Sequence, residues 1–124
     1  MEIVISIRPE HLNNIRSGKK KWELRKRLPE DKILTGEIKK IWVWETSPVS
    51  KIVGYIESNK IEKGSPNELW NKHGKDFGVN KEFYNQYYQN KEYAVALKID
   101  SWVACENANH TLAPQGYIYI KNSN

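Results

Sequence analysis

Short runs of alternating apolar residues, separated by turn residues, constrain the fold of this chain most. Residues 2–7 place Ile3, Ile5 and Ile7 on one face of a strand, and residues 92–99 repeat the pattern. Further strands are predicted at 20–26, 38–44, 51–61, 101–105 and 116–121. Because no βαβ unit repeats along the chain, the pattern predicts an α+β fold: a mainly antiparallel β-barrel of about six strands with surrounding α-helices.

The predicted helices are marked by their first and last residues. A short helix begins at Pro9 and stops at Gly18. Ser65, followed by proline and then by Glu68, forms a capping box that starts a second helix. Asn80 caps a third helix, in which tyrosines recur at helical spacing and predict a face that packs against the barrel.

Three segments are expected to contain turns, bends or loops. Residues 28–36 contain Pro29, two acids and a glycine, and they predict a polar connection. Gly54 lies inside the strand predicted for 51–61, where we expect a bulge or bend because barrels need such kinks to close. Residues 106–114 are expected to form a loop.

Length and composition set the broad class. A chain of 124 residues is expected to form one domain, residues 1–124, with a core that needs neither disulfide nor metal. The formal charge of +5 favours contact with polyanions without specifying one. Cys105 is the only cysteine, and the first residues show neither a signal peptide nor a membrane anchor, so we expect a cytoplasmic protein. His11, His73 and His110 are scattered, and neither a metal site nor a cofactor is indicated.

Residues 17–27, Ser-Gly-Lys-Lys-Lys-Trp-Glu-Leu-Arg-Lys-Arg, carry the strongest indication of a binding site. Strand alternation directs Trp22 and Leu24 into the core, and Lys21, Glu23 and Arg25 to the opposite face. A carboxylate between cations suits an anionic ligand that also offers hydrogen-bond donors, such as a nucleotide. Strand alternation would place Lys20 on the same face as Trp22. Lys20 therefore lies beside Glu23 only if the strand starts after Lys20 or bulges there.

The spacing Gly-x-Lys-x-x-Glu-x-Arg, met by Gly18, Lys20, Glu23 and Arg25, resembles the ASCH domain family of the PUA-like superfamily. Weaker blocks occur in the same order as in that family, at 5–10, 47–49, 53–57, 64–70 and 114–120. The resemblance implies a PUA-like barrel that binds RNA or a modified nucleoside in a cleft. It does not by itself imply an activity, since one fold serves many functions.

The interpretation we favour is RNA or single-stranded nucleic acid bound in a basic cleft, with a possible regulatory role. In that interpretation the phosphate ligands are Lys20, Lys21, Arg25 and Lys26, extended by Arg8. Glu23 would read a base edge. By analogy with the family, Ser47 and Gln115 would line the mouth of the cleft, although a turn cap and a solvated loop explain them nearly as well.

Two further functions stay open. One ASCH branch is similar to an amidohydrolase that deacetylates acetylcytidine through a lysine, a threonine and a glutamate. Lys20 matches its lysine, Glu23 stands in place of its threonine, and Asp76 is a loose substitute for its glutamate, so the catalytic set is incomplete. The other possibility is an interaction module whose basic strand docks an acidic protein. Without the resemblance, the lysines of residues 17–27 would be interpreted as the solvated side chains of an edge strand.

Overall fold

The computed structural model describes residues 1–107 and 113–121, in which four α-helices, one 3₁₀ turn and eight strands occur. The strands are β1 (Glu2–Ile7), β2 (Trp22–Arg25), β3 (Ile41–Glu45), β4 (Lys51–Glu57), β5 (Ile61–Gly64), β6 (Ala94–Lys98), β7 (Ser101–Ala104) and β8 (Tyr117–Ile120). The helices are α1 (Pro9–Arg16), α2 (Glu30–Leu34), α3 (Pro66–His73) and α4 (Lys81–Tyr87), with the 3₁₀ turn η1 (Gly74–Asp76) after α3.

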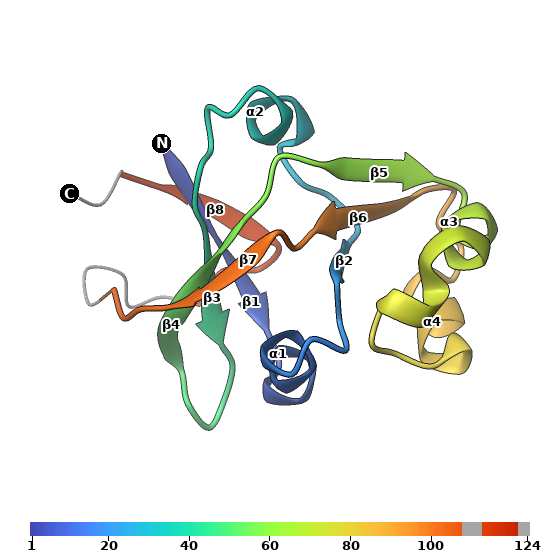
Figure 1. Ribbon diagram of the computed structural model, residues 1–124, viewed down its shortest axis with the longest axis horizontal. Coiled ribbons are helices and arrows are strands. Elements are labelled where there is room, and N and C mark those ends of the chain that lie inside the picture. The colour runs from blue at the N-terminus through green and yellow to red at the C-terminus, as the bar shows by residue number, and fades with distance from the viewer. Residues whose placement is uncertain (108–112, 122–124) are drawn as a thin grey trace.

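These strands form two sheets. The larger has the order β7-β4-β3-β1-β8 and the smaller the order β2-β6-β5 (Figure 1). Every neighbouring pair is antiparallel except β1 and β3, which run parallel. The predicted α+β fold with mainly antiparallel strands is therefore confirmed, while the barrel is open: no ladder among the described strands joins the two sheets into a closed ring.

A bent two-stranded ribbon connects the sheets. β4 pairs with β7 in the larger sheet, and their continuations, β5 and β6, pair in the smaller one. The bend at residues 58–60 is bridged by backbone bonds from Asp100 N to Glu57 O (3.1 Å) and from Lys98 N to Lys60 O (2.9 Å). The prediction of a single strand over residues 51–61 was wrong, because the chain passes from the larger sheet to the smaller one within this segment.

The predicted irregularity at Gly54 is confirmed. The register of β3 against β4 shifts so that Val43 faces Gly54 and Trp44 faces Ile52, which leaves Val53 as the extra residue of a bulge. A Cβ at Gly54 would overlap Val103 O and would lie 2.7 Å from the ring of Trp102. Glycine is needed here because β7 approaches too closely for any side chain.

The main core lies between the two sheets and is closed by α1 and α2. It combines the isoleucines of β1 with Leu12 and Ile15 of α1, Ile33 of α2 and Leu97 of β6. Residues 28–36, predicted to be only a connection, thus contain a short helix. α2 forms because Ile33 is fully buried, a contribution from packing that local polarity does not reveal.

The second core packs α3, α4 and Phe77 between them against the smaller sheet, beside which the two helices lie in Figure 1. Trp22 and Leu24 face these helices, as alternation predicted. Ser65 Oγ accepts a bond from Glu68 N (3.2 Å) and Asn80 Oδ1 one from Phe83 N (2.8 Å), so both predicted caps are confirmed. None of the helices in the described part is long and apolar enough to cross a membrane.

Candidate functional site: a charged pocket between the two sheets

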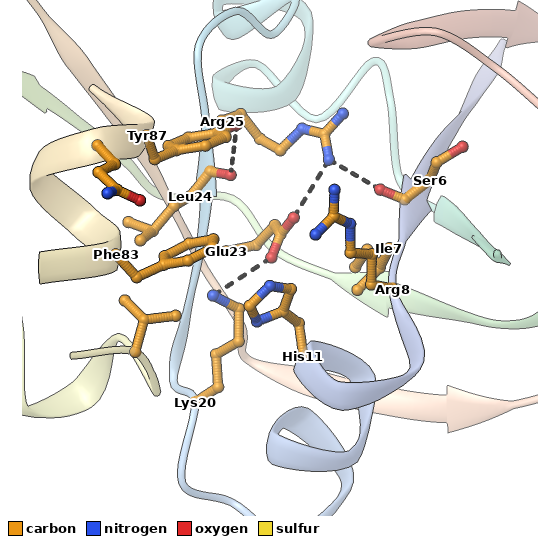
Figure 2. Close-up of a pocket in the computed structure, with 12 residues that line it drawn as sticks. Ser6, Ile7, Arg8, His11, Lys20, Glu23, Leu24, Arg25, Phe83 and Tyr87 are labelled. Carbon is orange, nitrogen blue, oxygen red and sulfur yellow. Dashed lines mark hydrogen bonds and ion pairs between the residues drawn. The ribbon is translucent and has the colours of Figure 1, made fainter. Parts of the chain in front are cut away.

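A pocket of about 350 Å³ lies where the carboxyl end of β1, the first turn of α1, β2 and α4 meet (Figure 2). Below, "the pocket" always means this site. Its lining residues are Ser6, Ile7, Arg8, His11, Lys20, Glu23, Leu24, Arg25, Val79, Phe83, Gln86 and Tyr87. One wall is charged and the other, formed largely by α4, is aromatic. This volume lies within the usual range for small-ligand sites.

Glu23 is the centre of the charged wall. Its carboxylate lies 3.5 Å from Lys20 Nζ and 3.3 Å from Arg25 Nη1, and only 6% of its side chain is exposed. Two cations therefore stabilise one buried carboxylate, a favourable arrangement because an unpaired charge at this depth is costly. Figure 2 shows the three side chains converging from neighbouring positions of one segment.

Arg25 also ties the two sheets together. Its guanidinium donates to Ser6 O at the end of β1 (3.0 Å) and to Gly116 O just before β8 (2.8 Å), while β2 itself belongs to the smaller sheet. Charged donors make the stronger class of hydrogen bond. Arg25 is thus largely engaged by the protein and sets the width of the pocket.

Lys20 forms the floor of the pocket. Its Nζ donates to Phe77 O (3.1 Å), and its backbone N donates to Asn14 O (2.9 Å). Gly78 packs directly on it: a Cβ at that position would lie 2.8 Å from Lys20 Cβ, and the φ of +68° favours glycine independently. β2 begins at Trp22, so the strand starts after Lys20 and its alternation does not apply to that residue. The Lys20 side chain can therefore lie beside Glu23, as the predicted site requires.

Arg8 and His11 come from the start of α1 and lie on the open side of the network. The Arg8 side chain is exposed and forms no hydrogen bond or ion pair with any described residue. Burial, followed by the charge of Lys20, lowers the pKa of His11 below its ordinary value of 6.5, so the ring is neutral at pH 7. The pocket thus offers one available cation and one neutral imidazole.

The aromatic wall consists of Phe83 and Tyr87, one turn apart on α4. Their rings are nearly parallel, with centroids 6.2 Å apart, and His11 packs 5.1 Å from Phe83. The Tyr87 hydroxyl donates to Leu24 O (3.4 Å), and burial raises its pKa. Lys26 Nζ lies 4.7 Å from the Tyr87 ring centroid, within the range of a cation–π contact, and Lys26 does not line the pocket.

The structure places the remaining predicted site residues elsewhere. Lys21 and Asp76 line a second, shallower hollow together with Lys19, Lys75 and Trp70, which we call the second hollow. Ser47 lies in the exposed turn after β3, outside both sets of lining residues.

Gln115 is exposed beside the pocket. Its neighbours Pro114 and Gly116 accept bonds from Ser6 and Arg25. The amidohydrolase set is not gathered in one place, because Asp76 lies in the second hollow.

His11, Phe83 and Tyr87 were not predicted as site residues. Arg8 and His11 are three positions apart on one helical turn, and this spacing could have placed His11 beside Arg8. The α4 aromatics reach the pocket only through tertiary packing. His110 lies outside the described residues, as does most of the loop predicted for 106–114.

Comparison with known proteins identifies the class. The ASCH domain profile matches residues 5–102, and the chain belongs to the ASCH domain family. Its structure is similar to the crystal structure of ASCH from Zymomonas mobilis, with a TM-score of 0.78 and 26% identity over 97% of this chain and 87% of that one.

Two curated relatives extend the comparison. The chain is 35% identical over 96 residues to an ASCH domain-containing ribonuclease of Zymomonas mobilis subsp. mobilis, a match that covers 77% of this chain and 62% of that protein. It is 30% identical over 102 residues to large ribosomal subunit protein uL22 of Ureaplasma parvum, covering 77% of this chain and 31% of that protein. This chain therefore spans less than two thirds of either relative.

Proposed function

We propose that this protein binds single-stranded RNA and that one nucleotide of the strand enters the pocket. The observation that carries the proposal is the exposed, unpaired Arg8, which lines the pocket together with the buried Lys20-Glu23-Arg25 network and the aromatic wall. A phosphate would contact Arg8, and a base would pack against Phe83 or Tyr87, since stacking of a base on an aromatic side chain contributes about 1–3 kcal/mol.

The charge of the pocket supports an anionic ligand. Arg8, Lys20 and Arg25 carry three positive charges against one negative charge on Glu23, and His11 is neutral. Glu23 already accepts a hydrogen bond from Arg25 and forms an ion pair with Lys20, so its main role is to position these two cations, while a free lone pair could still receive a base amino group. RNA is preferred to other polyanions because a relative with 35% identity is named as a ribonuclease.

The test is the variant R8E, measured by affinity for a single-stranded RNA. Arg8 is exposed and unpaired, so its reversal leaves the fold intact, whereas reversal of Lys20 or Arg25 would break the buried network. We expect R8E to weaken binding by about tenfold to a hundredfold, the range for loss of a charged hydrogen bond. Binding by the native protein should also weaken with rising salt.

The matched control is K39E. Lys39 is exposed and precedes β3, and since β3 runs parallel to β1, it lies at the end of the sheet opposite the pocket. The control changes the net charge as R8E does. Equal affinity of R8E and K39E for the RNA would contradict the proposal.

A second candidate function, RNA cleavage, is favoured by His11. A neutral imidazole can accept the proton of a ribose 2′-hydroxyl, whose oxygen then attacks the adjacent phosphorus; the P–O5′ bond breaks and water protonates the leaving oxygen. Arg8 would stabilise the charge that develops on the phosphate. The relative named as a ribonuclease supports this step.

Cleavage is tested with H11Q and with an RNA in which 2′-deoxy residues replace the ribose. We expect the native protein to cut the RNA but not the deoxy analogue, and H11Q to bind RNA without cutting it. Intact RNA after incubation with the native protein would exclude cleavage and leave the binding proposal standing.

A further inference from the structure

The second hollow lies directly behind the floor of the pocket. Val79 lines both, and the segment 19–21 separates them: Lys20 turns inward to Glu23, while Lys19 and Lys21 on either side of it are exposed and line the second hollow. A strand that leaves the pocket over α1 or Val79 would therefore meet the second hollow next.

The wall between the two is fixed by hydrogen bonds. Asn14 Nδ2 donates to Gly78 O (3.1 Å), and Lys21 N donates to Asp76 O (2.7 Å). Together with the bond from Lys20 Nζ to Phe77 O, they join the end of α1, the start of β2 and the segment after α3. The separation between the two sites is thus preset, which limits the entropy lost when one ligand occupies both.

The second hollow carries available positive charge. Lys19, Lys21 and Lys75 are exposed, and none of their ammonium groups forms an ion pair or hydrogen bond within residues 1–107 and 113–121. Asp76 is the single acid among the lining residues. Three lysines against one aspartate leave a net attraction for phosphate, and lysine makes flexible, sequence-independent contacts of the kind that backbone binding uses.

We propose that the second hollow binds the phosphates that flank the pocket nucleotide in the same RNA strand. The proposal rests on the RNA binding proposed above and adds that the ligand is a strand of several nucleotides rather than a mononucleotide. The pocket holds one nucleotide, and the second hollow adds length-dependent affinity.

The test is the triple variant K19Q/K21Q/K75Q against the control K39Q/K91Q/K121Q. The control removes the same charge from exposed lysines that line neither site. Affinity is measured across salt concentrations for a single-stranded RNA of about twelve nucleotides, a typical length for such sites, and for a dinucleotide.

Only the triple variant should lose affinity for the longer RNA, by about tenfold at physiological salt. The slope of log affinity against log salt should become less steep by about 2, because each of the three lost phosphate contacts contributes roughly 0.7. Its dinucleotide affinity should match that of the control.

The outcomes separate the two proposals. If the triple variant and its control have the same salt slope while R8E still weakens binding, the second hollow is not a phosphate site and the pocket proposal stands. If the native protein binds neither RNA, both proposals fail. A single variant, K75Q, provides a graded check, since it should lower the slope by about 0.7.

Discussion

The pocket and the second hollow use neighbouring lysines in opposite ways. Lys20 is buried and held by Glu23 and by Phe77 O, whereas Lys19 and Lys21 are exposed and unpaired. Three consecutive lysines therefore have two different roles: Lys20 is part of the structure of the pocket, and Lys19 and Lys21 are available to a ligand. Burial and partners, which sequence does not display, decide which role a cation has.

The largest difference between the regions should appear when Glu23 is removed. E23A leaves Lys20 and Arg25 without their shared carboxylate, and breaking a buried ion pair in this way costs about 3–5 kcal/mol. The exposed Glu92 is the control, since E92A should change stability by less than about 0.5 kcal/mol. Urea denaturation measures both, and equal midpoints would show that the network contributes no stability.

A smaller effect should come from the backbone beneath Lys20. Gly78 and Gly18 both have positive φ, but only at Gly78 would a Cβ overlap Lys20, because Gly18 has no neighbour within 4 Å. G18A should cost about 1–2 kcal/mol from backbone strain, and G78A should cost about 1–3 kcal/mol more from overpacking. Thermal unfolding of the two variants measures these losses. Equal losses of stability in G18A and G78A would mean that the Lys20 side chain moves aside without cost.

The smallest effect should be the pH dependence that His11 introduces. Its folded pKa lies below the unfolded value of 6.5, so the unfolded chain binds the proton more readily. The stability that the neutral ring contributes is present above pH 6.5 and is lost as the pH falls through the folded pKa. Relative to H11Q, the native protein should lose stability as the pH falls below the unfolded pKa of about 6.5. Parallel curves for the two proteins would indicate that His11 titrates normally.

Much of the fold followed from local pattern. The strands at both ends of the chain, the caps Ser65 and Asn80 and the bulge at Gly54 are encoded by neighbouring residues, and the structure has them where the sequence predicts. The parallel β1–β3 pair and the bend after β4 were not predicted, because each depends on which distant segment lies alongside. α2 was missed because its stability comes from the burial of Ile33.

The geometry of the candidate pocket was predicted only where it is local. The Lys20-Glu23-Arg25 set arises within one segment, so its spacing could be read directly. Lys21 was assigned to the same face because alternation was extended one residue too far: β2 starts at Trp22, and Lys21 is turned away by its backbone bond to Asp76 O. The aromatic wall comes from α4, about sixty residues further along, where the tyrosines resemble any buried helix face.

The most direct test of the central claim is a map of backbone amide chemical shifts while the protein is titrated with a single-stranded RNA. The account predicts the largest changes at Arg8, His11 and Val79, followed by Lys19 and Lys75, with little change at Lys39. Saturable changes confined to the amino end of β3, with Arg8 and His11 unaffected, would contradict it.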